Sequence, residues 1–168
     1  RSGGSIIEPE ENLVIHTGSI GDAVYTAHWK PVKYTVDYRS DYEANVELMP
    51  ADSSVDFDSW YYIEAKIPRR EGYTFSGWSW THVVDDETVT TVFEPGESVR
   101  NLTTGDTVVL NAVWTPITYN ATFDIHEDIG SSAVLYSGAL VYNYTVNTAL
   151  PISVPNPSRQ GYFFEGWI

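Results

Sequence analysis

The 168-residue chain contains no cysteine, few basic residues and no long apolar run. Without cysteine it can form neither a disulfide nor a thiolate metal site, and it has no thiol nucleophile. It has 9 basic and 23 acidic residues, which leave a formal charge of −14. This balance argues against binding to a nucleic-acid backbone, because phosphate contacts need clustered lysine and arginine. We interpret the acidic excess as a solvated surface that keeps the protein soluble.

Signals for membrane insertion and catalysis are also missing. No apolar run approaches the roughly 20 residues of a membrane-spanning helix, so we expect no membrane insertion. The sequence contains no Ser-His-Asp order, no G-x-S-x-G and no glycine-rich phosphate loop. His82 with Asp85, Asp86 and Glu87 comes nearest to a metal or acid–base cluster, and we interpret it as a solvated acidic loop. We therefore predict a protein that is not an enzyme, with no cofactor and no metal.

A short aromatic phrase occurs twice, as Gly72–Trp78 (GYTFSGW) and as Gly161–Trp167 (GYFFEGW). Other segments recur with a spacing of about 85 residues: Ala27–Trp29 with Ala112–Trp114, and Tyr34–Tyr38 with Tyr119–Phe123. A steady period of this length indicates tandem modules rather than one domain with a single active site.

Between these landmarks the residue pattern is mostly that of β-strands, with β-branched and aromatic residues in rough alternation. We expect strands at 34–38, 88–93 and 107–114, and a strand pair over 132–144 that bends near Gly138. Glu94-Pro95-Gly96 is a strong turn signal. Helix signals are few. Asp56–Lys66 is the best helix candidate, because its acidic start and basic end suit the helix dipole. Its counterpart at 147–152 contains Pro151, so any helix there is about one turn long.

The glycines and aromatic residues of the repeated phrase have structural tasks. Gly72 and Gly161 can adopt positive φ, and Gly77 and Gly166 leave room beside the neighbouring tryptophan. An aromatic stripe at strand spacing more often forms a core than a ligand platform. We therefore expect the core of the central module to contain Tyr73, Phe75, Trp78 and Trp114.

The string from Pro68 to Trp78, the Gly105-Asp106 turn and the ending Asn111–Trp114 together resemble the Listeria–Bacteroides repeat, the B repeat of internalins. That family reads as an opening strand, Pro-x-x-x-GYxFxGW and a last strand that ends in A-x-W. The resemblance implies a mainly β, small α+β fold of tandem β-grasp (ubiquitin-like) modules with little helix. Segments 39–43 and 124–128 depart from it, because they are acidic and polar where the family has a glycine-rich turn.

By this resemblance the fold-defining residues are Gly72, Tyr73, Phe75, Gly77, Trp78 and Trp114 in the central copy, Gly161, Tyr162, Phe164, Gly166 and Trp167 in the second copy, and Trp29. The resemblance also implies an extracellular location at the bacterial cell surface or cell wall. There such modules serve as stalks or in adhesion without known catalysis.

The repeats are out of register with the ends of the chain. Residues 31–114 form a complete module, 1–30 match the C-terminal part of one repeat, and 115–168 match the N-terminal part of a further repeat. Unpaired edges favour strand addition, so residues 1–30 of another molecule can complete 115–168 in a head-to-tail association. The alternative is a longer chain cut in its glycine-rich loop.

Two functions fit these features. The first is a stalk or spacer whose main partners are neighbouring repeats, made stiff by short proline-containing linkers at 30–33 and 115–117. The second is a binding module. Trp60, Tyr61 and Tyr62 cannot all face one core, so at least one ring points outward and can contact a glycan or a host protein.

Overall fold

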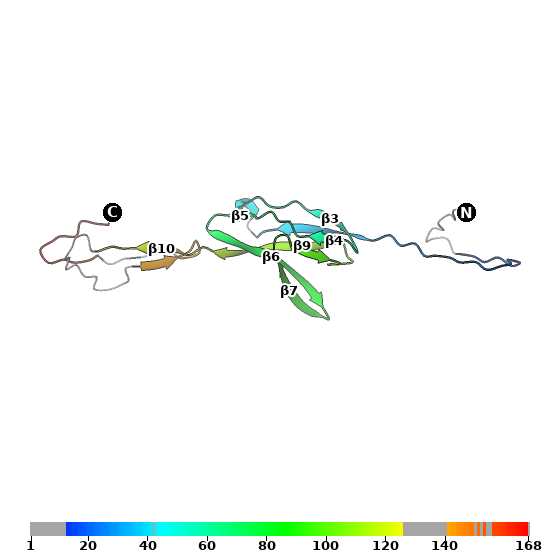
Figure 1. The fold of residues 1–168 in the computed structure, drawn as a ribbon. Helices are drawn as coiled ribbons and strands as arrows, with labels where there is room; N and C mark the ends of the chain where they lie inside the picture. Colours follow the sequence, from blue (N-terminus) through cyan, green and yellow to red (C-terminus); the bar gives the residue numbers. More distant parts are fainter. Residues whose placement is uncertain are drawn as a thin grey trace. The chain divides into compact units, whose positions relative to one another are not determined.

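The computed structural model of the protein describes residues 13–41, 43–125, 141–149, 151, 153 and 156–167 (Figure 1). The chain divides into two compact units, residues 1–30 and residues 31–168. Most of the strand pair expected over 132–144 lies outside the described residues.

The second unit contains a five-stranded sheet in the order β3-β1-β9-β6-β7. Its strands are β1 (Lys33–Arg39), β3 (Ser53–Asp56), β6 (Tyr73–Val84), β7 (Glu87–Phe93) and β9 (Thr107–Pro116). β1 and β9 are parallel, and every other neighbouring pair is antiparallel. The predicted mainly β fold is confirmed, and a central parallel pair made of the first and last long strands is the order of a β-grasp module. The expected strands at 34–38, 88–93 and 107–114 and the turn at Pro95-Gly96 are confirmed as well.

Alternating residues of the central strands form the core on one face of the sheet. In β1 every second residue points inward, so Tyr34, Val36 and Tyr38 are between 0% and 5% exposed. The parallel neighbour β9 contributes Val108 and Leu110 to the same face. Among the described residues, the buried hydrophobic side chains are Tyr34, Val36, Tyr38, Val55, Ile63, Trp78, Phe93, Val99, Val108 and Leu110.

A β-bulge explains the spacing of the aromatic residues in GYTFSGW. Residues three apart point to opposite faces of a regular strand, yet the rings of Phe75 and Trp78 meet edge to face with centroids 5.0 Å apart. The pairing of β6 with β9 shifts between Phe75 and Gly77, which adds one residue to β6. Gly77 has φ 123° at this point. The bulge returns Trp78 to the core face, where it is fully buried.

The structure gives Gly77 a reason that the sequence did not show. A Cβ on Gly77 would lie 2.9 Å from the carbonyl oxygen of Phe93 and 2.9 Å from Cγ1 of Val92. The glycine therefore makes room for the neighbouring strand β7. Positive φ is confirmed for Gly72 and Gly161, at 76° and 84°.

The helix expected over Asp56–Lys66 is wrong. β3 ends at Asp56, a turn follows, and β4 (Trp60–Tyr62) pairs with β8 (Ser98–Arg100). Asp58 has φ 67°, which a helix does not allow. Consecutive aromatic residues favour a strand, and β8 supplies hydrogen-bonding partners that are distant in the sequence. Helix in the described residues is limited to the short 3-10 turn η1 (Glu43–Asn45), which leads into β2 (Val46–Glu47), the partner of β5 (Arg69–Arg70).

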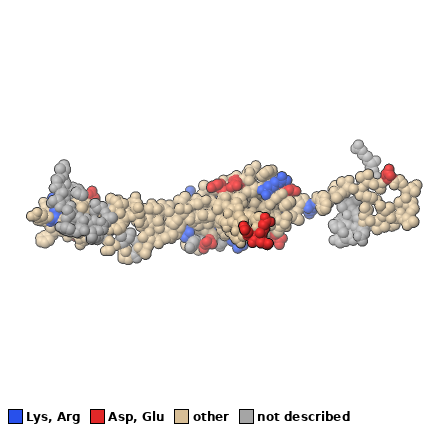
Figure 2. Space-filling model, turned by 90° about the horizontal axis from the view of Figure 1, so that it is seen from below, with Lys and Arg blue, Asp and Glu red and all other residues tan. Residues whose placement is uncertain are grey.

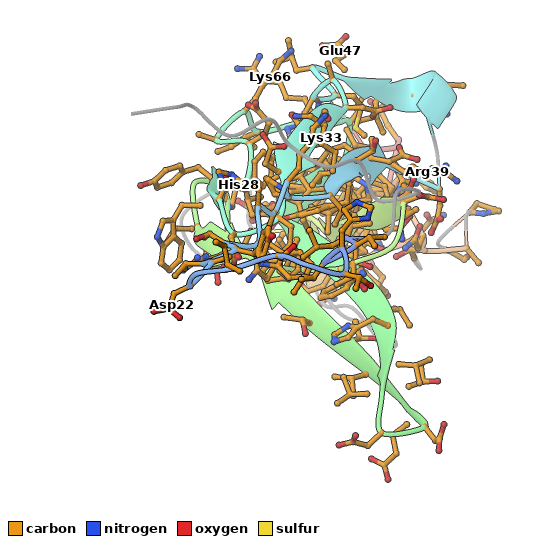
Figure 3. All side chains as sticks on the ribbon, turned by 90° about the vertical axis from the view of Figure 1, so that its right-hand side faces the viewer. Asp22, His28, Lys33, Arg39, Glu47 and Lys66 are labelled. Carbon is orange, nitrogen blue, oxygen red and sulfur yellow. The ribbon has the colours of Figure 1, made fainter. Side chains whose placement is uncertain are left out.

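β6 and β7 continue past the sheet as a hairpin (Figures 1 and 3). Its turn residues Asp85 and Asp86 have φ 51° and 65°, the pattern of a type I′ turn. The expected acidic loop is therefore the tip of this hairpin, and Figure 3 shows carboxylates there pointing away from the ribbon. The ring of His82 stacks on Trp80 with centroids 3.7 Å apart, so this histidine packs along the hairpin.

The second repeat reproduces the aromatic geometry of the first. β10 (Tyr119–Thr122) pairs with β11 (Val141–Tyr144), as β1 pairs with β3. Phe164 meets Trp167 at 5.3 Å and 66°, against 5.0 Å and 62° for Phe75 and Trp78. Phe123 meets Trp167 at 5.1 Å, which matches the 4.7 Å between Tyr38 and Trp78.

The described residues of the first unit, 13–30, form no strand. The strand expected to end at Trp29 does not form, since residues 22–30 have no assigned secondary structure. In the central module, by contrast, β9 is held by β1 on one side and β6 on the other. Accordingly, Ile20, Val24 and Trp29 are 97%, 92% and 91% exposed.

Candidate functional site

The aromatic cluster predicted from the sequence lies on the ribbon of β4 and β8. Trp60 and Tyr62 are 64% and 67% exposed, whereas Tyr61 is half-buried and packs against the core. Residues two apart on a strand share a face and lie about 7 Å from each other. The ribbon therefore presents two large rings to solvent, side by side, and we call Trp60, Tyr62 and Arg100 the aromatic surface.

Tyr61 fixes this ribbon to the sheet. Its hydroxyl lies 2.9 Å from the hydroxyl of Tyr38, which also accepts a hydrogen bond of 2.9 Å from the amide of Glu64. Burial raises the pKa of the Tyr38 phenol well above its ordinary value, and the hydrogen bond with Tyr61 raises it further. Because this phenol stays neutral, it can serve both partners and hold β4 in place.

A polar group borders the two exposed rings. The guanidinium carbon of Arg100 lies 5.8 Å from the centroid of the Trp60 ring, within the range of a cation–π contact. Arg100 also donates to Oδ1 of Asp58 at 3.2 Å. Asn101 holds the Asp58 turn in place by accepting from its amide at 2.6 Å and donating to its carboxylate at 2.8 Å. Flat rings beside a fixed cation can stack on a sugar ring or on a partner's apolar side chain.

The sequence did not indicate Arg100 or Asn101 as part of this surface. The only local signal is the turn at Glu94-Pro95-Gly96, which is followed by Ser98-Val99-Arg100 with a single apolar residue between two polar ones. That pattern is typical of a short strand, but it does not indicate which other strand pairs with it. The pairing of Trp60 with Arg100 becomes visible only in the three-dimensional structure.

The fold-defining residues have different environments. Trp78 is in the centre of the core and Phe75 packs against it. Tyr73 and Trp114 are half-buried, which corrects the prediction that both belong to the core. The indole of Trp114 donates to Oγ of Ser40 at 3.1 Å and meets the Phe75 ring at 5.6 Å. In the second copy, the partly exposed residues are Tyr162 at 64%, Phe164 at 38% and Trp167 at 37%.

Charge is spread over the described surface. The face in Figure 2 carries small groups of both signs on the central module, with no continuous basic area. Among the described residues, no group of three or more histidine, aspartate or glutamate side chains is placed to hold a metal ion. The described residues also contain no helix long and apolar enough to cross a membrane.

Comparison with known proteins places the chain in a family. The model of the Listeria-Bacteroides repeat domain matches residues 34–109 and 119–168. Repeats of this family are typical of bacterial surface proteins and are typically not enzymes. No curated protein and no solved structure matches the chain significantly. The two matched segments contain both GYxFxGW phrases, together with the strand pairs β1–β3 and β10–β11. The chain belongs to the Listeria-Bacteroides repeat domain family.

Proposed function

We propose that the chain is a spacer in the stalk of a bacterial surface protein, built to carry tension along a row of repeats. The observation behind this proposal is the parallel pairing of β1 with β9, in which Thr35 is opposite Thr107 and Arg39 is opposite Asn111. The chain enters the module at the start of β1 and leaves it at the end of β9. Tension along the chain therefore pulls two neighbouring strands in opposite directions along their length.

This geometry loads the inter-strand hydrogen bonds together. When antiparallel strands are pulled apart from their shared end, the bonds break one after another and each rupture needs little force. In a sheared parallel pair, all the bonds must fail within a small displacement. The connection to the next repeat is short, because β9 ends at Pro116 and β10 begins at Tyr119. Little slack is therefore available before load reaches the sheet.

Single-molecule stretching tests the proposal, and the absence of native cysteine makes the handles unique. Handles at Val32→Cys and Ile117→Cys load β1 against β9 in shear. Handles at Val32→Cys and Ser59→Cys pull the β1–β3 hairpin apart from one end and serve as the control. We expect the first pair to need a several-fold higher force and to release about 80 residues, roughly 28 nm of contour length. Equal, low forces for both pairs would rule out a load-bearing role.

We propose binding as a second function for the same module, carried by the aromatic surface. Trp60 and Tyr62 are exposed although their ribbon is fixed to the core, and exposed neighbouring aromatic residues are typical of interaction surfaces. A glycan or a protein of the host would be the ligand. A glycan array with Trp60→Ala and Tyr62→Ala tests this, with Phe163→Ala as the control because Phe163 is 98% exposed elsewhere. Signals that survive both ribbon variants would exclude this surface.

A further inference from the structure

The turn that opens GYTFSGW contacts the second repeat. If Gly72 carried a Cβ, that atom would lie 2.1 Å from Cγ1 of Val146. The hydroxyl of Tyr73 donates to Oδ1 of Asn147 at 2.7 Å. The backbone between the repeats closes the contact, because the amide of Ile117 donates to the carbonyl oxygen of Gly72 at 2.9 Å. We call Arg70–Tyr73 the socket and Val146-Asn147 the plug.

Both parts are held in shape by local contacts. In the socket, the guanidinium carbon of Arg70 lies 3.7 Å from the centroid of the Tyr73 ring, which orients the phenol. The plug is a turn after β11, closed by a hydrogen bond of 3.0 Å from the amide of Thr148 to the carbonyl of Thr145. Oγ1 of Thr145 accepts from the amide of Asn147 at 3.1 Å. Little conformational entropy is therefore lost when the two meet.

The socket occurs a second time, and the described residues place no plug against it. Arg159 lies over the Tyr162 ring at 4.0 Å, as Arg70 lies over Tyr73 at 3.7 Å. Gly161 has φ 84° against 76° for Gly72. Within the described part of the chain, however, no atom lies within 4 Å of the position of a Cβ on Gly161. Tyr162 is 64% exposed, whereas Tyr73 is half-buried.

The plug also has a counterpart, in the central module. The turn after β3 is closed by a hydrogen bond from the amide of Ser59 to the carbonyl of Asp56, at 3.1 Å. The equivalent bond in the plug joins Thr148 to Thr145 at 3.0 Å. Each repeat therefore has a hydrogen-bonded turn, which follows β3 in the central module and β11 in the second repeat. Each repeat also has an Arg-x-Gly-Tyr turn before its GYxFxGW aromatic residues. A row of such repeats can use the same joint at every step.

We propose that the Arg-x-Gly-Tyr turn is a docking site between repeats. In this proposal, Arg159–Tyr162 receives the turn of the following repeat that corresponds to the plug, Val146-Asn147. The glycine is needed because the plug takes the space of its missing side chain, and the tyrosine hydroxyl selects a turn that offers a hydrogen-bond acceptor. This inference deepens the spacer role, since docked joints make the row of repeats stiff.

Residual dipolar couplings of the full chain test the docking. We expect residues 33–116 and 119–125 with 141–149 to share one alignment tensor. Gly72→Ala and, from the other side, Val146→Ser should both abolish the shared tensor. Gly161→Ala is the matched control, because it introduces the same backbone strain where no described atom lies within 4 Å of the added Cβ, and it should leave the shared tensor intact. Unchanged amide shifts of the β1 and β9 core residues show that each variant keeps its sheet.

An extended chain tests the second socket, Arg159–Tyr162. Appending residues 79–168 after Trp167 adds strands equivalent to β7 and β9 behind the second aromatic phrase and places another plug after them. In that chain we expect Gly161→Ala to uncouple the added repeat. Separate tensors in the wild-type chain, or a shared tensor that survives Gly72→Ala, would overturn the proposal. The rupture force of the central module does not depend on the joint, so the spacer role is tested separately.

Discussion

Replacing Gly77 by alanine tests why the repeated phrase needs its second glycine. At φ 123°, an alanine is outside its favoured backbone regions, and holding it there costs about 1–3 kcal/mol. Its Cβ would also lie 2.9 Å from the carbonyl oxygen of Phe93, a backbone atom that moves only with β7. Overpacking of this kind costs a further 1–3 kcal/mol or so. We therefore expect the free energy of unfolding to fall by about 2–6 kcal/mol.

Gly96→Ala is the matched control within the same module. Gly96 has φ 81°, and no atom of the described residues lies within 4 Å of its virtual Cβ. Gly96→Ala therefore incurs only the cost of holding an alanine at positive φ, about 1–2 kcal/mol of unfolding free energy. The assay is urea unfolding, followed by fluorescence and circular dichroism, whose coincidence checks two-state behaviour. If Gly77→Ala cost no more than Gly96→Ala, the close approach of β7 would not be the reason for the glycine.

Two further predictions concern the phenol of Tyr38 and the hairpin tip. Burial raises the pKa of Tyr38 above its unfolded value of 10.0, so its contribution to stability is complete below about pH 10 and is lost as the pH rises further. Urea unfolding at pH 8 and pH 11 should show this loss, and Tyr34→Phe/Tyr38→Phe should reduce it, because Tyr34 is also buried and its pKa is also raised. An unchanged slope with pH in the double variant would contradict the assignment. Asp86→Gly should raise the free energy of unfolding by about 0.5–1 kcal/mol, since glycine suits φ 65° and one of the clustered tip charges is removed. Asp86→Ala is its control and should be destabilising, and a loss of stability in Asp86→Gly would contradict the type I′ turn.

Local sequence patterns predicted many strands and turns, because these depend on the backbone preferences and side-chain alternation of neighbouring residues. Alternating residues in Tyr34–Tyr38 indicate a strand with one buried face, and the structure buries that face. The Pro-Gly signal at 95–96 is a turn because proline and glycine restrict or free the backbone wherever they occur. Positive φ at Gly72 and Gly161 follows from the same reasoning.

The predictions that were wrong concern partners distant in the sequence. The charges of Asp56–Lys66 suit a helix, but Ser98–Arg100 offers this segment strand pairing. The buried Ile63 and the half-buried Tyr61, which packs against the core, favour the strand. The residues of Asp56–Lys66 alone cannot show that a distant strand will pair with them and outweigh the helix. The candidate aromatic surface likewise has one part that local sequence predicts and one part that depends on distant residues. Its outward rings could be expected from alternation alone, whereas Arg100 reaches Trp60 only through the β4–β8 ribbon.

The sequence by itself determined that this protein is a row of repeats, which residues repeat, and where most strands and turns occur. Only the tertiary structure decided what the repeated glycines are for. Gly77 accommodates β7 and permits the bulge that returns Trp78 to the core, and Gly72 accommodates Val146 of the next repeat. The physical reason is that a glycine's conformational freedom follows from its own residue type. The atom that occupies the space beside it, however, comes from another part of the chain.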